Sequence, residues 1–405
     1  TNGTTQDATF SVTSAANIVF LANSQVSSTA GRLNQNYTVT NASYSIYLAR
    51  GGITLNANGG TINLTADSMS LNGAGNAIQS TNGYLNIATY SNTAAISLGT
   101  ATTGLTLPTV LWDGSTSGAA PTSGNIGNAI FKPGFAMITV GSATQTGYIY
   151  VDTANTDNFV FTSPLTLQTS IAGTYIVYLR GVISDAYRLL GQGYATANLT
   201  IKGLDSSTTI RNDVGAITIN TTGSQSYTGI YMQGNWTLSA SGANANITFG
   251  NINSSAAFTL NATAYNNIVF RSGASIAPTA SASTNFTFTA QTGNVIFGQG
   301  VSFSSAGSNF TFQGLTLDAS AGGLSMTTGT GVLTLISDNF LLFALNDKFV
   351  GTNGIVNIQP YSILTSIGVN TNMCVSNGAA VSCTTSLPGT LSASFQNFNL
   401  IRIGS

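Results

Sequence analysis

The run GGITLNANGGTINLTA, residues 51–66, contains the pattern that decides the fold. ITL at 53–55 and INL at 62–64 each place a polar residue between two apolar residues, and glycine and asparagine separate the two triplets. Successive side chains of a β-strand point to opposite sides, so this alternation puts the apolar residues on one face. The run therefore predicts two short strands joined by a tight turn.

The same apolar-polar-apolar unit recurs through most of the chain, with neighbouring copies commonly 7 to 11 residues apart. Sandwiches and solenoids both contain such strands, but a nearly constant spacing favours the solenoid. We predict an all-β chain of stacked coils, each of roughly 20 residues. Copies of the unit lie at 10–12, 69–71, 85–87, 96–98, 105–107, 236–238, 247–249, 258–260, 286–288, 310–312, 315–317 and 333–335.

The pattern changes between residues 108 and 197, where aromatic residues, prolines and charges are denser. This part is expected to be an inserted β domain or a widened section of the solenoid, with a short helix at 184–191. A solenoid also needs atypical ends, because open coils expose unpaired strand edges. The predicted parts are an N-terminal strand segment (1–39), a β repeat region (40–107), the inserted domain (108–197), a second repeat region (198–344) and a C-terminal cap (345–405).

The composition excludes several kinds of chemistry. Charged residues are 5% of the 405 residues, and the chain contains no histidine, whereas globular proteins average about 25% charged residues. Without histidine there is no imidazole base and no histidine metal site. Glutamate is also absent, so a glycosidase carboxylate pair would need two aspartates. We therefore expect no enzyme and no cofactor, and we interpret the oxygen-rich segment 152–158 as a polar turn rather than a calcium site.

Nucleic acid and membrane partners are also unexpected. Ten Lys and Arg residues are too few for a surface that tracks phosphates. No apolar run approaches the length of about 18 residues that a membrane helix needs. The chain begins without methionine and without a basic, apolar leader. We interpret it as a mature exported protein, located outside the cell or on its surface.

Cys374 and Cys383 are the two cysteines, and Asn377-Gly378 lies between them. Asn-Gly is a strong hairpin-turn signal. The arrangement predicts a disulfide across a hairpin, formed in an oxidising compartment. The alternative is a pair of buried free thiols. The spacing does not match a zinc-binding CxxC pair.

Asn-X-Ser/Thr sequons are frequent, but a chain this rich in Asn, Ser and Thr contains about as many by chance. An exported chain would make them available for glycosylation. For Asn63 and Asn246 the alternative is an asparagine ladder between coils. Besides Asn2, the sequons are Asn36, Asn41, Asn63, Asn198, Asn220, Asn235, Asn246, Asn253, Asn261, Asn285 and Asn309.

The N-terminal segment has two alternating apolar patches, formed by Phe10 with Val12 and by Ile18 with Phe20. Such a strand can add to the exposed sheet edge of a neighbouring copy. A head-to-tail contact of this kind propagates as a filament. These four residues are therefore candidates for an assembly strand. The alternative is that residues 8–21 form the first coil of their own solenoid.

The run at 51–66 resembles the repeats of filamentous-haemagglutinin-type exoproteins, which are parallel β-helices that serve as bacterial surface adhesins. The resemblance covers about 60 residues well and residues 200–340 loosely. The Asn-Pro motifs of that family's secretion domain are absent. The Thr/Asn/Gly-rich composition is similar as well to β-rich extracellular filament subunits of archaea and bacteria, including pilins joined by donor strands.

These resemblances imply a structural subunit of an extracellular homopolymeric filament or sheath, whose partners are copies of itself. The alternative is a cell-surface adhesin shaft that binds glycans or the surfaces of host or neighbouring cells. A β-helical polysaccharide-active enzyme fits less well, because the aspartates and cations are scattered along the chain.

Overall fold

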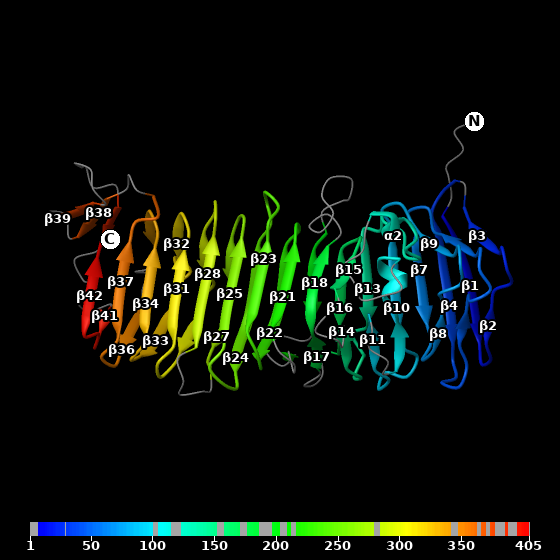
Figure 1. Cartoon of the computed structure of the whole chain (residues 1–405), viewed down its shortest axis with the longest axis horizontal. Helices are drawn as coiled ribbons and strands as arrows, with labels where there is room; N and C mark the ends of the chain where they lie inside the picture. The colour runs from blue at the N-terminus through cyan, green and yellow to red at the C-terminus, as the bar shows by residue number, and fades with distance from the viewer. Residues whose placement is uncertain are drawn as a thin grey trace. The chain divides into compact units, whose positions relative to one another are not determined.

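The chain is a β-solenoid of about 12 turns, with 52% of its residues in strands and 2% in helices. The predicted all-β solenoid is therefore confirmed (Figure 1). The computed structural model describes residues 7–28, 30–99, 104–114, 123–151, 158–170, 176–185, 197–202, 209–211, 216–278, 284–341, 347–362, 366–369, 373–376, 385–387 and 395–404.

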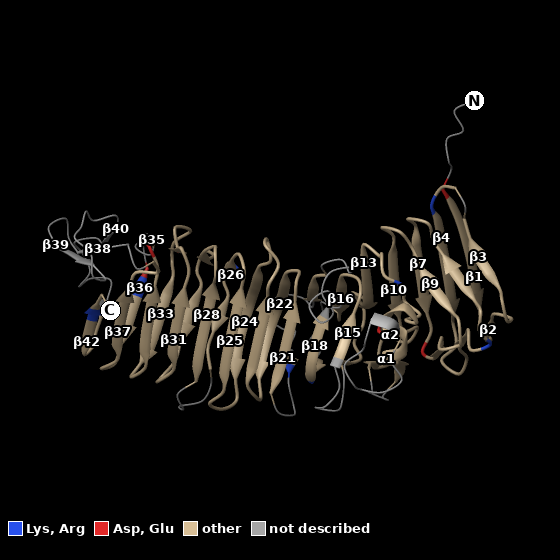
Figure 2. Cartoon of the chain, turned by 45° about the horizontal axis from the view of Figure 1, so that its top comes forward, with Lys and Arg blue, Asp and Glu red and all other residues tan. Residues whose placement is uncertain are grey.

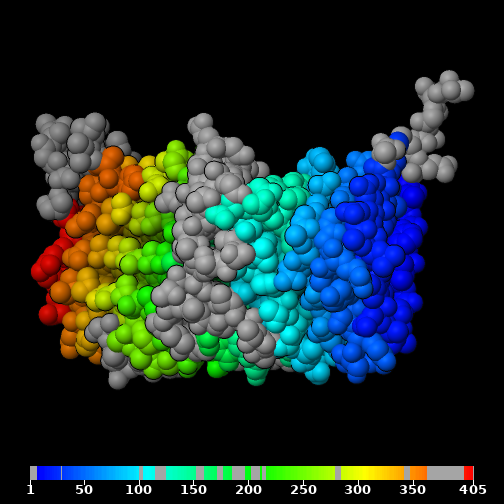
Figure 3. Space-filling view, turned by 45° about the vertical axis from the view of Figure 1, so that its right-hand side comes forward, coloured from blue at the N-terminus to red at the C-terminus, as the bar shows by residue number. Residues whose placement is uncertain are grey.

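The coils fall into two compact units, Thr1–Thr222 and Gly223–Ser405. The coils of each unit form bands that cross its surface side by side (Figure 3). The strands of the first unit are β1 (Ala8–Ser14), β2 (Ile18–Val19), β3 (Gln25–Ser27), β4 (Leu33–Val39), β5 (Ile46–Tyr47), β6 (Thr54–Asn56), β7 (Thr61–Thr65), β8 (Met69–Ser70), β9 (Ala77–Gln79), β10 (Tyr84–Ala88), β11 (Ile96–Leu98), β12 (Leu105–Leu107), β13 (Met137–Gly141), β14 (Ile149–Val151), β15 (Asn158–Phe161), β16 (Leu165–Gln168), β17 (Ile176–Leu179), β18 (Gly181–Asp185), β19 (Leu199–Lys202), β20 (Thr209–Arg211) and β21 (Ile217–Thr221).

Parallel pairing between successive coils builds the sheets of the first unit. The longest runs in the order β1–β4–β7–β10–β13–β16–β19. Strands β2–β5–β8 and β3–β6–β9 form the other two sides of the early coils. Strands β14–β17–β20 and β15–β18–β21 do the same in the later coils. Strands β13–β18 thus continue the coiled sheets through the described residues between 137 and 185.

Two short helices, α1 (Thr109–Trp112) and α2 (Ser123–Gly127), lie between β12 and β13. The Trp112 ring packs edge-on against Phe131 and Phe159, with ring centroids 5.0 and 5.2 Å away. The prediction of a helix at 184–191 is wrong for its first two residues, because Ser184 and Asp185 belong to strand β18. Ser184 pairs in parallel with Asn220 of β21, a contact that a local helical pattern does not reveal. Residues 186–191 lie outside the described part of the chain.

The second unit repeats a three-sided coil. Its sheets run in the orders β23–β25–β28–β31–β34–β37–β42, β24–β26–β29–β32–β35 and β24–β27–β30–β33–β36–β41. Strand β38 pairs antiparallel with β39 and parallel with β40. The strands are β22 (Gln225–Met232), β23 (Trp236–Ala240), β24 (Ile247–Ser254), β25 (Thr259–Ala264), β26 (Ile268–Phe270), β27 (Ser275–Ile276), β28 (Asn285–Ala290), β29 (Val295–Phe297), β30 (Ser302–Ser304), β31 (Asn309–Gln313), β32 (Thr316–Asp318), β33 (Ser325–Gly329), β34 (Val332–Ile336), β35 (Asn339–Leu341), β36 (Lys348–Gly351), β37 (Ile355–Gln359), β38 (Ser366–Val369), β39 (Met373–Ser376), β40 (Thr385–Leu387), β41 (Phe395–Gln396) and β42 (Leu400–Ile403).

The register sets the length of a coil. Phe286 pairs with Phe310, and Phe310 pairs with Leu333. Successive coils therefore take 310 − 286 = 24 and 333 − 310 = 23 residues. This is slightly longer than the expected length, because three strands and three turns must fit into each coil.

Aromatic columns fill the interior of the second unit. The Phe270 and Phe297 rings stack 5.4 Å apart with 4° between their planes, and Phe286 stacks on Phe310 at 5.0 Å. All four side chains are buried. Their positions follow from the alternation, because equivalent inward residues of successive coils lie directly above one another. Burying each such side chain contributes roughly 1.5–3 kcal/mol.

Turns between strands use residues that tolerate positive φ. Within the run at 51–66, Asn58 and Gly59 have φ values of 44° and 86°. Glycine adopts this conformation without steric cost, and asparagine adopts it more readily than most residues. The predicted turn between the two strands of that run is thus confirmed.

Candidate functional site: the open first coil

The first coil of the first unit is open on one side. Strands β1, β2 and β3 are each terminal in their sheets, and among the described residues each pairs only with the second coil. The Ala8 N–H donates to the Arg32 carbonyl at 2.9 Å, and the Ser14 carbonyl accepts from the Thr40 N–H at 2.8 Å. Neighbouring residues of a strand direct their backbone groups to opposite sides. The backbone groups of Thr9, Ser11 and Thr13 therefore face the open edge.

Strand β1 itself carries none of the residues that usually protect an edge strand against pairing. The seven residues of β1, ATFSVTS, include no charged residue, proline or glycine. Native proteins usually blunt an exposed edge with lysine, proline, a bulge or a covering segment. A long, uncharged edge strand is a template for another strand.

Apolar side chains border the open edge. Phe10 is 42% exposed, Val19 49% and Leu21 66%. Phe10 and Phe20 both rest against Tyr37 of the second coil, with ring centroids 5.9 and 5.2 Å away. In the second coil the inward residues are buried, whereas most of the described apolar side chains of the first coil are partly exposed. An exposed apolar surface of this kind marks an interaction site.

The structure places the four predicted assembly residues together in this first coil. Phe10 and Val12 lie in β1, which pairs in parallel with β4 of its own chain. Ile18 is buried in β2, and Phe20 follows it with partial exposure. Residues 8–21 thus occupy the first coil of their own solenoid, which is the alternative arrangement stated above.

A buried hydrogen-bond network lies directly beneath the open coil. The Tyr37 hydroxyl donates to Gln35 Oε1 at 2.9 Å, and Gln35 Nε2 donates to the carbonyl of Val26 in β3 at 3.2 Å. Burial raises the pKa of Tyr37 above its usual range. The same arrangement occurs in the second unit, where Tyr227 donates to Gln225 at 2.8 Å. In the first unit, the bond from Gln35 to Val26 ties the second coil to the first.

A second open edge ends the sheets of the second unit. Strand β42 pairs with β37, and β41 pairs with β36, with no further partner strand among the described residues. Leu400 and Ile401 in β42 are 39% and 37% exposed. The chain therefore carries two different strand edges with apolar side chains beside them.

The eleven sequons after Asn2 all lie in the described residues and fall into two groups. Asn63 forms the predicted ladder, because its amide donates to Asn36 Oδ1 at 2.6 Å and its oxygen accepts from Asn86 at 2.8 Å. Asn246 Oδ1 accepts from the backbone N–H of Asn267 at 2.9 Å. Asn36, Asn63, Asn220, Asn246, Asn253 and Asn309 are half-buried, whereas Asn41, Asn198, Asn235, Asn261 and Asn285 are exposed.

Two other candidate features fall largely on residues that the structure does not describe. Cys383 lies outside the described residues, and for Cys374 only the backbone in β39 is described. The disulfide therefore stays a prediction. Residues 152–157 of the oxygen-rich turn also lie outside. Elsewhere in the described chain no three Asp or Cys side chains gather as a metal site. The described residues also contain no helix that is both long and apolar enough to cross a membrane.

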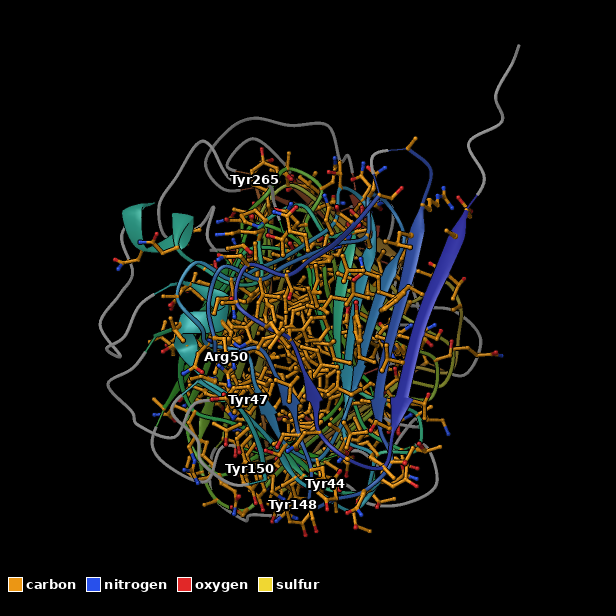
Figure 4. All side chains as sticks on the ribbon, turned by 90° about the vertical axis from the view of Figure 1, so that its right-hand side faces the viewer. Tyr44, Tyr47, Arg50, Tyr148, Tyr150 and Tyr265 are labelled. Atoms are coloured by element: carbon orange, nitrogen blue, oxygen red, sulfur yellow. The ribbon has the colours of Figure 1, made fainter. Side chains whose placement is uncertain are left out.

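A tyrosine cluster was not expected from the sequence. The Tyr150 and Tyr178 rings stack 5.0 Å apart with 5° between their planes, and Tyr148 lies beside both. In the end-on view, Tyr148 and Tyr150 lie on the same side of the coil as Tyr44 and Tyr47 (Figure 4). The signal was the alternation at residues 148–150, because burying Ile149 directs both tyrosines outward.

Comparison with protein-family models, curated proteins and solved structures finds no match to this chain.

Proposed function

We propose that the protein is a structural subunit of an extracellular homopolymeric filament or sheath. The observation that carries this proposal is the open edge of β1, which is uncharged and bordered by the exposed side chains of Phe10, Val19 and Leu21. The first coil of one copy stacks on the last coil of another copy. The contact buries the exposed side chains of Phe10, Val19 and Leu21 and pairs the outward backbone groups of strand β1.

The partner surface is the edge formed by β41 and β42 of a second copy. Each copy then contributes a different surface to the contact, and such a heterologous contact propagates unless its rotation closes a ring. Because residues 8–21 pair within their own chain, we favour stacking of terminal coils over exchange of a donor strand. The scarcity of charged residues and the lack of histidine support an extracellular setting, since few groups make the stability of the fold depend on pH near neutrality. We further propose that the protein belongs with the solenoid surface exoproteins that its repeats resemble.

The substitution Thr13→Pro tests the edge. Proline removes the N–H that faces the open side and leaves the bonds of Ala8 and Ser14 to the second coil in place. Thr13→Val is the matched control, because it keeps the N–H and the β-branched shape. We expect Thr13→Pro to remain folded by circular dichroism but to elute as a monomer, while Thr13→Val forms filaments under the electron microscope. Filaments of normal length from Thr13→Pro would overturn the proposal.

The substitution Leu21→Lys tests the apolar border without touching the backbone. Leu21 is 66% exposed, so a lysine there costs the monomer little but places an unpaired charge in the contact. Leu315→Lys in the second unit is the control, since Leu315 is also exposed. We expect only Leu21→Lys to prevent assembly. Equal assembly of both variants would contradict the proposed contact.

The tyrosine cluster supports an adhesin shaft as the second candidate function. Tyr148 is exposed beside the Tyr150–Tyr178 stack, and aromatic side chains supply large contact areas at binding surfaces. The double substitution Tyr148→Ala and Tyr150→Ala should reduce attachment of the protein to glycan-coated surfaces without changing filament length. Unchanged attachment would leave the filament role as the sole proposal.

A further inference from the structure

The outward face of the sheet over β23, β25, β28 and β31 is a regular array of polar side chains, and one row of it continues across β34 and β37. Two residues further along the strands, a second row consists of Ser239, Thr263, Thr289 and Gln313 and ends in Ile336 and Gln359. The members of the first row are Thr237, Asn261, Thr287, Thr311, Thr334 and Asn357.

The first row meets a charged residue at its end, where Arg402 of β42 pairs with Asn357. The six strands contain no Lys, Arg or Asp, as the tan ribbons of β25, β28 and β31 in Figure 2 illustrate. Their aromatic residues point inward, where Phe286, Phe288, Phe310 and Phe312 are buried in stacked pairs. The outward rows therefore present hydroxyl, amide and methyl groups without aromatic rings.

The array is also rigid and periodic. Strands of a sheet lie about 4.8 Å apart, and alternate residues along a strand are about 6.6 Å apart. Threonine is β-branched and has few χ1 rotamers, so neighbouring strands hold each hydroxyl and methyl group in a limited set of positions. The stacked phenylalanines beneath the face restrain the backbone. Over β23, β25, β28 and β31 the result is a two-dimensional lattice of groups that can both donate and accept hydrogen bonds.

We propose that this face binds ice. A crystal surface repeats its hydrogen-bonding atoms in two dimensions, and a rigid periodic array can meet many of them at once. Hydroxyl and amide groups exchange hydrogen bonds with water, whereas a charged group would have to give up a tightly held hydration shell. A face that binds polysaccharide would be expected to use exposed aromatic rings, and this one has none on its two rows. The inference concerns a different surface from the assembly edge and does not depend on it.

The experiment uses the full-length protein and slowly grown ice as the probe. The fraction of protein incorporated into the ice is measured for the wild type and for Thr287→Lys, which places a long charged side chain at the centre of the first row. Thr327→Lys is the matched control, because Thr327 is a half-buried, outward residue of β33 on a different sheet. Circular dichroism verifies that both variants are folded.

We expect the ice to take up the wild type and Thr327→Lys, and to exclude Thr287→Lys. Exclusion of the wild-type protein from ice would overturn the proposal. It would do so even if the wild-type protein bound another periodic surface, such as crystalline cellulose. Equal incorporation of both lysine variants would also overturn it, because the binding face would then lie elsewhere. Thr287→Val provides a second measurement, since it keeps the shape of threonine and removes only the hydroxyl. It should retain more ice incorporation than Thr287→Lys.

Discussion

Asn63 donates a hydrogen bond of 2.6 Å to Oδ1 of Asn36 on the preceding coil and accepts one of 2.8 Å from Asn86 on the following coil. Asn36 in turn donates to the Ser11 hydroxyl of β1 at 3.0 Å. The ladder therefore connects four successive coils along the outer side of one sheet. Its middle member holds two of these bonds at once, which distinguishes it from an isolated surface asparagine.

The substitution Asn63→Ala should destabilise the first unit. It removes two side-chain hydrogen bonds and leaves a donor on Asn86 and an acceptor on Asn36 without their partner, at a cost of about 2 kcal/mol. Urea unfolding followed by circular dichroism measures the change. Asn261→Ala is the control, because Asn261 is exposed, and it should stay within about 0.5 kcal/mol of the wild type. Equal effects of the two substitutions would contradict the structural role of the ladder.

The substitution Phe297→Ala should be among the most damaging in the second unit. Phe297 is buried, stacks on Phe270 and meets Phe303 and Phe312 edge-on. Truncating such a side chain leaves a cavity and costs about 3–5 kcal/mol. Leu341→Ala, at a side chain that is 44% exposed, should cost far less. Thermal unfolding of both variants checks the difference, and similar melting temperatures would contradict the aromatic column as the stabilising core.

The stability of the protein should depend on pH mainly on the alkaline side. Burial raises the pKa values of Tyr37 and Tyr227, so the folded state favours their neutral forms. An unfolded tyrosine ionises from about pH 10. The stabilisation is therefore complete below about pH 10 and is lost as pH rises above it. Because the chain has no histidine, the unfolding midpoint should stay nearly constant from about pH 5.5 to pH 9.

The variants Tyr37→Phe and Tyr227→Phe isolate this alkaline effect. Each removes one ionisable hydroxyl, so the fall of the unfolding midpoint above about pH 10 should become shallower. Each also loses the bond to its glutamine, which lowers stability by a constant amount at lower pH. An unchanged alkaline slope, or a transition near pH 6.5, would show that other groups control the pH dependence.

Cys374 and Cys383 should form a disulfide. Closing a loop of this length stabilises a fold by about 3 kcal/mol in the chain-entropy account. Alkylation of the denatured, unreduced protein followed by mass measurement should find no labelled thiol, and prior reduction should reveal two. Two labelled thiols before reduction would establish that both cysteines are free.

The sequence predicted the strands well because their signal is local. At residues 286–288 the order Phe-Thr-Phe states which side chains point inward, and the structure buries both phenylalanines and turns Thr287 outward. Asn58-Gly59 likewise predicted its turn. The helices α1 and α2 were missed because each is only four or five residues long, which is too short for a helical period to appear.

The candidate site was predicted only in part. The alternation at Phe10 and Val12 marked a strand, but the choice between a coil of its own chain and a strand for another copy depends on pairing with Leu33–Val39. The exposure of Leu21 and the Gln35–Tyr37 network also depend on neighbours in other coils. The alternation in the sequence shows which face of a strand is apolar, but it does not show which strand lies beside it.

The sequence by itself determined the fold class, the inward and outward residues of most strands, and the absence of histidine-dependent chemistry. The unit at 315–317 is an exception, because Leu315 is exposed. Only the tertiary structure decided the register, in which Phe310 lies beside Phe286, and with it the ladders, aromatic columns and open edges. The physical reason is that side-chain direction follows from the two-residue period of a strand. Register, by contrast, is set by contacts between coils about 23 or 24 residues apart, and those contacts form only when neighbouring coils stack.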